Sequence, residues 1–425
     1  MKSLLYLTYN VFITLAVPFI WIAAYFNDKL GGSLNGQKSL QSNVLSFNKS
    51  IQDRPKPVIW THAASAGEFE QLRPVLARLA SLDVYIYQTF TSATIYYKAS
   101  QDKVFDGVSF LPWDLFFKVD RFVTLLKPDL FINTRHDIWP NLLLVMQRHG
   151  VRNILINANL YPKSRRLLPG ARQVNRVIFD QISQVYTGSN DLAGLLKQIY
   201  SGPVSVVGDT RFDQVHERAK INQNVLISEK YITDCRVIIY GSVGNSDLRV
   251  ITSAISNTLT DKAFRHIIVP HETSERDLIP WQTELFRQNI RSIRKSELDQ
   301  FDDEPVIIWD SVGQLADLYK YATLAFIGAG FGAGVHSVTE AAIYHVPSAH
   351  GPKFDILAEA TELVEEGLST VVNSSDELSD FLTQPEETIV ELSKRIEIFV
   401  NSRVGASDRI MSSDPILRSL TQREN

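Results

Sequence analysis

Short apolar runs alternate with amphipathic runs twice along this 425-residue chain, once before Gly208 and again after it. Such alternation predicts parallel strands joined by helices that cover both faces of a sheet. The length exceeds what one hydrophobic core usually serves, so two α/β domains are expected. The candidate strands of the first half are Val58–His62, Val84–Thr89, Leu130–Asn133, Asn153–Asn157 and Val185–Thr187, and its clearest amphipathic runs are Glu68–Leu82 and Trp139–His149.

The second half repeats the architecture without repeating the sequence. Its candidate strands are Val237–Tyr240, His266–Val269, Val306–Trp309, Leu324–Ile327 and Thr370–Val372, and its candidate helices are Asp247–Leu259, Ser274–Gln288, Gly313–Tyr319 and Ser337–Tyr344. A last long helix is predicted at about Pro385–Ser402, where Ile389, Leu392, Ile396 and Phe399 recur at helical spacing. We therefore expect a first domain at 28–215, a second at 216–385, and a terminal segment at 386–425.

The N-terminus carries no charge between Lys2 and Asp28. The apolar stretch from Leu4 to Phe26 is long enough for a helix to cross the roughly 30 Å hydrocarbon core of a bilayer. We therefore predict a membrane anchor at residues 1–27; a cleaved signal peptide and a buried core helix are the competing interpretations. Most lysines and arginines of the flanking segments follow the stretch, which favours folded domains on the cytoplasmic side. Residues 27–56, rich in Gly, Ser, Asn and Gln, are expected to form a polar loop.

Charge and cysteine content exclude several classes of site. The formal net charge of −4 gives no support for general nucleic-acid binding. Cys235 is the single cysteine, so neither an intramolecular disulfide nor a cysteine zinc site can form.

The glycine-rich segment from Leu324 to Pro347 carries the strongest local signal of the second half. A strand leads into Gly328, Gly330, Gly332 and Gly334, and a helix is expected to begin near Ser337. Glycines let the backbone approach a ligand, and a helix N-terminus suits a phosphate. His336 and Glu340 are four residues apart and would share one helix face, where Glu340 could accept hydrogen bonds from ribose hydroxyls. The alternative is a glycine turn that only packs strand against helix.

Two other strand ends of this half should meet the same edge of the sheet, because ligands bind at the carboxyl ends of parallel strands. One carries Ser242 and the other His271, with Arg276 close behind. Arg276 could bind a phosphate or a sugar carboxylate. The competing interpretations are a surface salt bridge for Arg276 and a structural role for His271.

In the first half, the sequence THAASAGEFE joins a strand to a helix. Ser65 and Glu68 have the spacing of a capping box, in which Glu68 only satisfies backbone amides. The functional interpretation makes Glu68 a general base facing a substrate hydroxyl, with Gly67 leaving room for that substrate. Asp137 follows one further strand and Asn157 ends another. Lys163, Arg165 and Arg166 form a basic cluster that could bind an anionic lipid phosphate, and the alternative is a solvated surface loop.

Several of these segments, in this order, resemble the Kdo (3-deoxy-D-manno-octulosonate) transferases. THAASAGEFEQLRPVL resembles the HxxSxGE…P motif of that family, IWPNLL its WPN segment and NANLYPKS its NARLSxxS segment. GDTRFD is similar to G[ND]xxFD, and the stretch from Asp310 to Ala342 resembles DxxGEL…GGHNxxE. The later HVPSAHGP matches xxPxxxGP. The resemblance covers roughly residues 55–370 and the anchor.

The resemblance implies a GT-B fold, two Rossmann-like domains facing a central cleft, with the terminal helix returning to the first domain. It implies inverting transfer of Kdo from CMP-Kdo to a lipid A precursor (lipid IVA) at the inner membrane, with no metal ion or other cofactor. Glu68 would be the catalytic carboxylate. The donor site would comprise Ser242, His271, Arg276, Gly330, Gly332, Gly334, His336, Ser337 and Glu340, and the acceptor site Ser65, Gly67, Asp137, Asn157, Lys163 and Arg165.

The sequence departs from the family pattern at Arg135, where a carboxylate is frequent, at His271, where the pattern is Pro-Arg-His, and at Ser337, where Asn is usual. Two other functions therefore stay open. One is a different GT-B sugar-nucleotide enzyme, such as an epimerase or a transferase of another activated sugar. The other is a catalytically inactive, membrane-tethered homologue.

Overall fold

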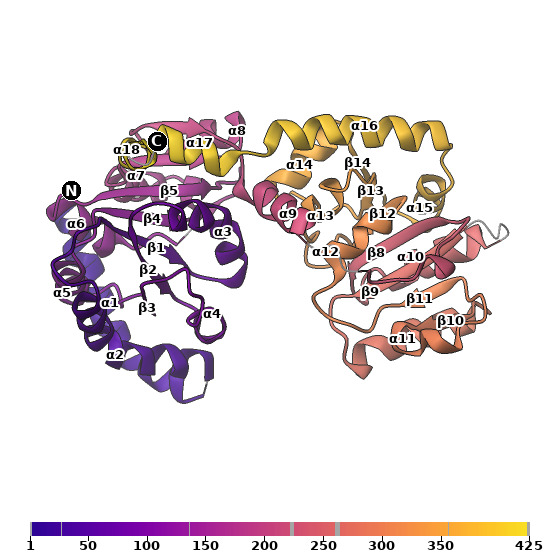
Figure 1. The fold of residues 1–425 in the computed structure, drawn as a ribbon, viewed down its shortest axis with the longest axis horizontal. Helices are drawn as coiled ribbons and strands as arrows, with labels where there is room; N and C mark the ends of the chain where they lie inside the picture. The colour runs from indigo at the N-terminus through magenta and orange to yellow at the C-terminus, as the bar shows by residue number, and fades with distance from the viewer. Residues whose placement is uncertain are drawn as a thin grey trace. The chain divides into compact units, whose positions relative to one another are not determined.

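The computed structural model describes residues 2–26, 28–135, 137–221, 225–259, 264–355 and 357–422. Two compact units contain the elements (Figure 1). The first comprises Met1–Gln214 together with Gly405–Asn425, and the second comprises Val215–Val404. Each unit is built on a parallel sheet of seven strands, which confirms the predicted α/β class.

The sheet of the first unit has the order β3-β2-β1-β4-β5-β6-β7. Its strands are β1 (Val58–Ala63), β2 (Tyr85–Phe90), β3 (Gly107–Phe110), β4 (Leu130–Thr134), β5 (Arg152–Ala158), β6 (Gln184–Thr187) and β7 (Val204–Val206). The chain winds outward from β1 in one direction and then from β4 in the other. The carboxyl ends of β1 and β4 therefore flank the switch point at which doubly wound sheets bind ligands.

Helices cover both faces of this sheet. They are α3 (Ala66–Ala80), α4 (Ala93–Ala99), α5 (Phe116–Leu126), α6 (Pro140–Arg148), α7 (Ala171–Phe179), α8 (Asn190–Leu196), α17 (Ala406–Ser413) and α18 (Pro415–Thr421), while α9 (Thr210–Ile221) leads into the second unit. Neighbouring residues of a strand pack into the cores on opposite faces of the sheet. Ile132 packs with Leu72 of α3, and Phe131 packs with Val145 of α6. Burial on both faces explains the continuous apolar runs of these strands.

The polar segment after the N-terminal stretch is a helix, α2 (Asp28–Ser50), so the prediction of a loop at 27–56 is wrong for residues 28–50. Its composition is poor for a helix, but Leu40, Val44 and Phe47 fall on one face and are buried in the core of the first unit, together with Ile51 just after the helix. Tertiary packing of this sparse apolar face outweighs the weak local preference.

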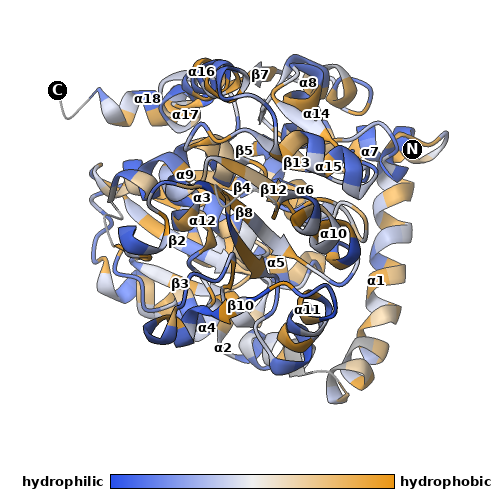
Figure 2. Cartoon of the chain, turned by 90° about the vertical axis from the view of Figure 1, so that its right-hand side faces the viewer, coloured by the Kyte–Doolittle hydropathy of each residue, from blue (hydrophilic) through white to orange (hydrophobic). Residues whose placement is uncertain are grey.

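Helix α1 (Lys2–Tyr25) lies against the first unit along one side only. Tyr6 is buried, the Tyr9 hydroxyl donates to Oδ2 of Asp114 at 2.8 Å, and Asn10 exchanges side-chain hydrogen bonds with Asn141 at 3.0 and 2.9 Å. The other side exposes large apolar residues, which are Leu4, Leu7, Phe12, Leu15, Phe19 and Ile22. Figure 2 shows the apolar colouring of this helix. Among the described helices, α1 is the one long and apolar enough to cross a membrane, a test that buried core helices and signal sequences also pass.

The sheet of the second unit has the order β10-β11-β9-β8-β12-β13-β14. Its strands are β8 (Arg236–Val243), β9 (Phe264–Pro270), β10 (Ser292–Arg294), β11 (Val306–Ile308), β12 (Leu324–Ile327), β13 (Ser348–His350) and β14 (Ser369–Val371). Its helices are α10 (Leu248–Thr258), α11 (Glu275–Arg287), α12 (Leu315–Leu318), α13 (Thr339–Ala342), α14 (Ala358–Glu365), α15 (Ser375–Leu382) and α16 (Glu386–Arg403). The switch point lies between β8 and β12, so the loops after these strands share one edge.

Two helical expectations for this unit need correction. The helix expected at Ser337–Tyr344 spans only the four residues Thr339–Ala342, and residues 334–337, between the glycine turn and the helix, have no regular secondary structure. The long helix α16 packs in the second unit through Ile389, whereas only the chain from Gly405 onward belongs to the first. The returning segment is therefore shorter than the 386–425 expected from the sequence.

Candidate active site

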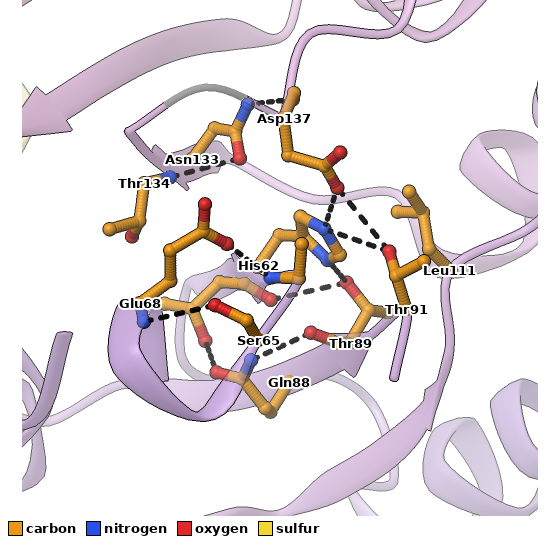
Figure 3. Close-up of polar contacts among 12 residues, drawn as sticks. His62, Ser65, Glu68, Gln88, Thr89, Thr91, Leu111, Asn133, Thr134 and Asp137 are labelled. Carbon is orange, nitrogen blue, oxygen red and sulfur yellow. Dashed lines mark hydrogen bonds and ion pairs between the residues drawn. The ribbon is translucent and has the colours of Figure 1, made fainter. Parts of the chain in front are cut away.

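A histidine–aspartate pair spans the switch point of the first unit. Nε2 of His62, on β1, lies 2.7 Å from Oδ2 of Asp137, which follows β4 (Figure 3). His62 is completely buried, and the Asp137 side chain is 17% exposed. A carboxylate at this distance requires a proton on Nε2 of the imidazole.

Two threonines fix this pair. Nδ1 of His62 lies 2.9 Å from Oγ1 of Thr89, whose oxygen also accepts a hydrogen bond from the indole of Trp60 at 2.8 Å. The Thr91 hydroxyl donates to Oδ2 of Asp137 at 3.3 Å. Burial raises the pKa of Asp137, but the hydrogen bond and charge of His62 outweigh it, so the pKa lies below the ordinary value. Asp137 therefore stays ionised at neutral pH.

Glu68 lies beside this pair on the first turn of α3. Its backbone amide donates to Oγ of Ser65 at 3.3 Å, as the capping box predicts. Its carboxylate departs from the capping box, because Oε2 accepts from the amide of Ala64 at 2.7 Å, one residue before the cap. This bond turns the carboxylate towards the end of β1 (Figure 3).

Burial is the main reason that the pKa of Glu68 is raised. The negative charge of Asp137 raises it further, whereas the Ala64 amide, His62 and Arg135 oppose the shift. A carboxylate with a raised pKa is a stronger base than an ordinary glutamate. The geometry therefore suits proton abstraction.

A second capping site in the chain shows what capping alone produces. At α15, Glu377 donates its amide to Oγ of Ser374 at 3.2 Å, and its carboxylate accepts from the amide of Asn373 at 2.8 Å. The geometry matches that of Ser65 and Glu68, but Glu377 is exposed. Burial and the neighbouring His62–Asp137 pair, and not the cap, distinguish Glu68.

Two arginines add positive charge to this site. Arg135, directly after β4, has a left-handed backbone with φ of 66°, and its buried Nε has no hydrogen-bond partner among the described residues. Arg166 is half-buried, and burial lowers the pKa of its guanidinium despite the opposing charges of Tyr161 and Asp137. The basic segment therefore turns Arg166 inward, whereas Lys163 and Arg165 lie at the surface. Non-glycine residues with positive φ are costly and concentrate at functional sites.

The remaining expected acceptor residues differ in their surroundings. A Cβ added to Gly67 would meet no atom within 4 Å, so space is open above the start of α3, where Ser65 is also exposed. Asn157 is buried instead, and its amide group holds Thr210 through hydrogen bonds of 2.7 and 3.0 Å. Asn157 therefore ties β5 to the start of α9, a structural role that the sequence did not indicate.

In the second unit, the glycines pack backbone against backbone. A Cβ on Gly328 would lie 2.3 Å from the carbonyl oxygen of Ser242, and one on Gly330 would lie 2.6 Å from the amide nitrogen of Gly351. Gly332 faces Oγ of Ser246, and Gly334 has a φ of 126°. The packing interpretation thus holds for Gly328 and Gly330. The four-residue α13 offers little of the helix dipole expected for a phosphate site.

Asp247, which the sequence analysis did not single out, joins the two loops of this switch point. It is completely buried, and Oδ2 accepts from the amides of Gly244 and Ala329, each at 2.9 Å. Ser242 and Ala329 both have left-handed backbones, with φ of 53° and 68°. A second residue missed from sequence, Lys353, donates through Nζ to the carbonyl of Gly332 at 2.8 Å.

The other expected donor residues lie around the same edge of this sheet. The rings of His271 and His336 stack with centroids 4.5 Å apart, and burial followed by the charge of His271 lowers the pKa of His336. Because His336 precedes α13, the expected shared helix face with Glu340 is wrong. The hydroxyl oxygens of Ser337 and Thr339 lie 2.9 Å apart.

Glu340 is on α13 and Arg276 is exposed on the first turn of α11. The salt bridge at this helix start joins Glu275 to Arg294 at 2.6 Å, so it is not the Arg276 salt bridge of the alternative interpretation. Among the described residues, no three His, Cys, Asp or Glu side chains gather as a metal site would require.

Comparison with known proteins agrees with the motifs. Residues 39–214 match the family model of 3-deoxy-D-manno-octulosonic-acid transferases. The transferase of that name from Aquifex aeolicus is 24% identical over 372 residues, covering 86% of this chain and 95% of the relative. The Chlamydia trachomatis serovar A transferase is 25% identical over 345 residues, covering 74% of this chain and 75% of the relative.

Solved structures share the fold. A UDP-GlcNAc 2-epimerase from Neisseria meningitidis superposes with a TM-score of 0.62 at 15% identity, covering 86% of this chain and all of the other. A glycosyltransferase from Rickettsia africae superposes with a TM-score of 0.55 at 10% identity, covering 87% and 99%. These likenesses identify the GT-B fold.

Proposed function

Because this chain belongs to the Kdo transferase family of glycosyltransferases, we propose that it transfers Kdo from CMP-Kdo to a lipid A precursor, lipid IVA, with inversion at the anomeric carbon. The observation that carries the proposal is the buried Glu68 carboxylate beside the His62–Asp137 pair, at the switch point of the first unit. The residues of this cluster suit removal of a proton from a sugar hydroxyl.

In the proposed step, Glu68 accepts the proton of an acceptor hydroxyl. The hydroxyl oxygen then forms a bond to the anomeric carbon of Kdo, and the bond from that carbon to the phosphate oxygen breaks. The electron pair leaves with CMP. Attack opposite the leaving group inverts the configuration in a single displacement, so the enzyme needs one base and no nucleophile of its own.

His62 and Asp137 hold this region in place, and Arg135 and Arg166 supply the charge that an anionic acceptor needs. Guanidinium groups match the planar oxygens of phosphates and carboxylates. Lys163 and Arg165 are exposed further along the chain, where they could bind a lipid phosphate at the protein surface. Ser65 and Gly67 border the open space beside Glu68.

We assign the donor to the second unit. Ser242, the turn Gly330–Gly334 and Lys353 would approach the phosphate of CMP-Kdo, and Glu340 would accept hydrogen bonds from the ribose hydroxyls. Arg276 and the stacked His271 and His336 would bind the remaining oxygens of the donor. The backbone amides of the loop, rather than a helix dipole, would carry the phosphate contact.

We also propose that the protein is held on the cytoplasmic face of the inner membrane, with α1 lying along the surface. Contacts to the first unit extend from Lys2 to Val17, so only about eight residues of α1 are left, far fewer than the roughly 20 that a crossing requires. A helix with one docked side and one apolar side suits the membrane interface.

A transfer assay tests the function. Purified protein, freshly generated CMP-Kdo and lipid IVA are mixed, and the lipid is analysed by mass spectrometry. A gain of one or more Kdo units is expected, and cytidine monophosphate should compete better than UDP. No gain, with a known transferase active in parallel, would reject the Kdo assignment and direct attention to another sugar nucleotide.

A further inference from the structure

We propose that an apolar pocket between α1 and the segment after β3 binds an acyl chain of the lipid acceptor. The pocket has a volume of about 200 Å³ and lies within the first unit. Ile13 and Val17 of α1 and Leu111 and Leu115 of the segment after β3 line it. Thr91 and Trp139 line it too, and Thr91 donates a hydrogen bond to Asp137 of the candidate site. The inference rests on the proposed function, because it assigns part of that acceptor to these residues.

The first argument is that the pocket is preformed. Gln37 of α2 donates to the carbonyl of Leu111 at 2.8 Å and accepts from the amide of Trp113 at 3.0 Å, which fixes the far wall. Asp114, within that wall, is buried and accepts from the amides of Asn141 and Leu142 at 2.9 and 2.8 Å. These polar groups of the wall are thereby engaged by protein, and the lining is mainly apolar, as suits hydrocarbon.

The second argument is continuity with the site. Thr91 lines the pocket and also donates to Oδ2 of Asp137, which binds His62. Trp139 lines the pocket two residues after Asp137. Consider a molecule whose polar head lies beside Glu68 and Asp137. The part of it that is attached to the head next to Thr91 would therefore enter the pocket. An amphiphile with sugar hydroxyls and attached hydrocarbon has this form.

The third argument is the position of α1. One side of this helix lines the pocket, and its other side exposes Leu4, Leu7 and Phe19. A second apolar groove, lined by Leu5, Phe12, Pro140 and Val174, lies along the same helix but has none of the site residues in its lining. An acyl chain in the pocket lined by Val17 would thus remain beside the apolar surface of α1, while the head group of the acceptor reached Glu68. We therefore favour this pocket over the groove.

Kinetics with acylated and deacylated acceptors test the inference. Val17→Trp fills the pocket, and Val11→Trp makes the same change at an exposed position of the same helix. We expect Val17→Trp to lower kcat/KM for lipid IVA about tenfold, the cost of losing the contacts of a few methylene groups. Its KM for CMP-Kdo and its use of the fully deacylated disaccharide should match wild type, and Val11→Trp should match wild type throughout. Equal losses with both acceptors, or no loss, would overturn the inference.

A binding measurement on wild-type protein separates this inference from the proposed function and does not depend on how Val17→Trp folds. Lipid IVA carrying a diazirine on one acyl chain is photolysed with the protein, and labelled peptides are mapped by mass spectrometry. Labels within residues 111–115 and around Val17 are expected, and deacylated acceptor should not reduce them. Labels elsewhere, with Kdo transfer intact, would reject the pocket. Labels in the pocket without any Kdo transfer would support the pocket and reject the proposed reaction.

Discussion

Nε2 of His62 lies 2.7 Å from Oδ2 of Asp137, although 75 positions separate the two residues in the chain. The pair joins the ends of β1 and β4, on either side of the point where the strand order reverses. Its carboxylate is also one of the charges that raise the pKa of Glu68. The pair therefore sets the electrostatic environment of the proposed base.

Replacing Asp137 should move the pH dependence of transfer. Asp137→Asn removes a negative charge that disfavours ionised Glu68, so the pKa of Glu68 should fall and the acidic limb of the kcat profile should move to lower pH. Activity at neutral pH should fall because His62 loses its ionic partner. Rate–pH profiles of purified variants give the measurement.

The chain offers a matched control in a second histidine–aspartate pair of the same unit. His149 and Asp120 lie 2.9 Å apart at the surface. Asp120→Asn should leave the acidic limb where it is in wild type. An unmoved limb in Asp137→Asn would contradict the coupling between Asp137 and Glu68.

Glu68→Gln should abolish transfer without loss of stability at neutral pH. The glutamine carbonyl can still accept the Ala64 amide, but it cannot accept a proton. Because folding raises the pKa of Glu68, ionised Glu68 opposes folding once the pH exceeds its ordinary range. The variant should therefore be as stable as wild type at acidic pH and at least as stable at pH 7, measured by urea unfolding.

Glu377→Gln makes the same substitution in the matching cap of α15. Transfer should be unaffected, since Glu377 is exposed and belongs to neither cluster. Retained transfer by Glu68→Gln would show that Glu68 acts only as a cap.

Asp114 should make the stability of the first unit depend on pH. Burial raises the pKa of Asp114 to about 7, against the hydrogen bonds from the Asn141 amide, the Tyr9 hydroxyl and the Leu142 amide. A raised folded pKa favours the protonated form, so its contribution to stability is complete below about pH 4 and is lost as the pH rises through about 7. Unfolding free energy should decline over this range in wild type. Asp114→Asn should flatten the decline, and an unchanged slope would argue against this pKa.

Two glycine-to-alanine substitutions should behave in opposite ways. Gly330→Ala places a methyl group 2.6 Å from the backbone of Gly351, which cannot yield as a side chain can, and should destabilise the second unit by about 1–3 kcal/mol. Gly67→Ala meets no atom and should keep or slightly raise stability. If the space beside Gly67 holds the acceptor, its KM for lipid IVA should rise. Thermal unfolding and acceptor kinetics distinguish the two effects.

Local patterns were sufficient for much of the fold. Apolar runs predicted five strands in each unit, with ends within three residues of those observed, because strands buried on both faces leave little freedom of composition. Ser65 was recognised as a cap and Glu68 as its partner, since capping depends on spacing of three residues. Four strands were missed. The edge strands β3, β7 and β10 are short and partly exposed, and β13 is buried but only three residues long.

The amino-acid sequence by itself determined most of the strands and helices, since these depend on neighbours within a few residues. Tertiary structure alone decided that His62 pairs with Asp137, that α2 is a helix, and that Asp247 joins the two loops of its sheet. It also decided which side of α1 faces the protein. These features depend on burial and charge supplied by residues far away in the chain, which no local pattern contains.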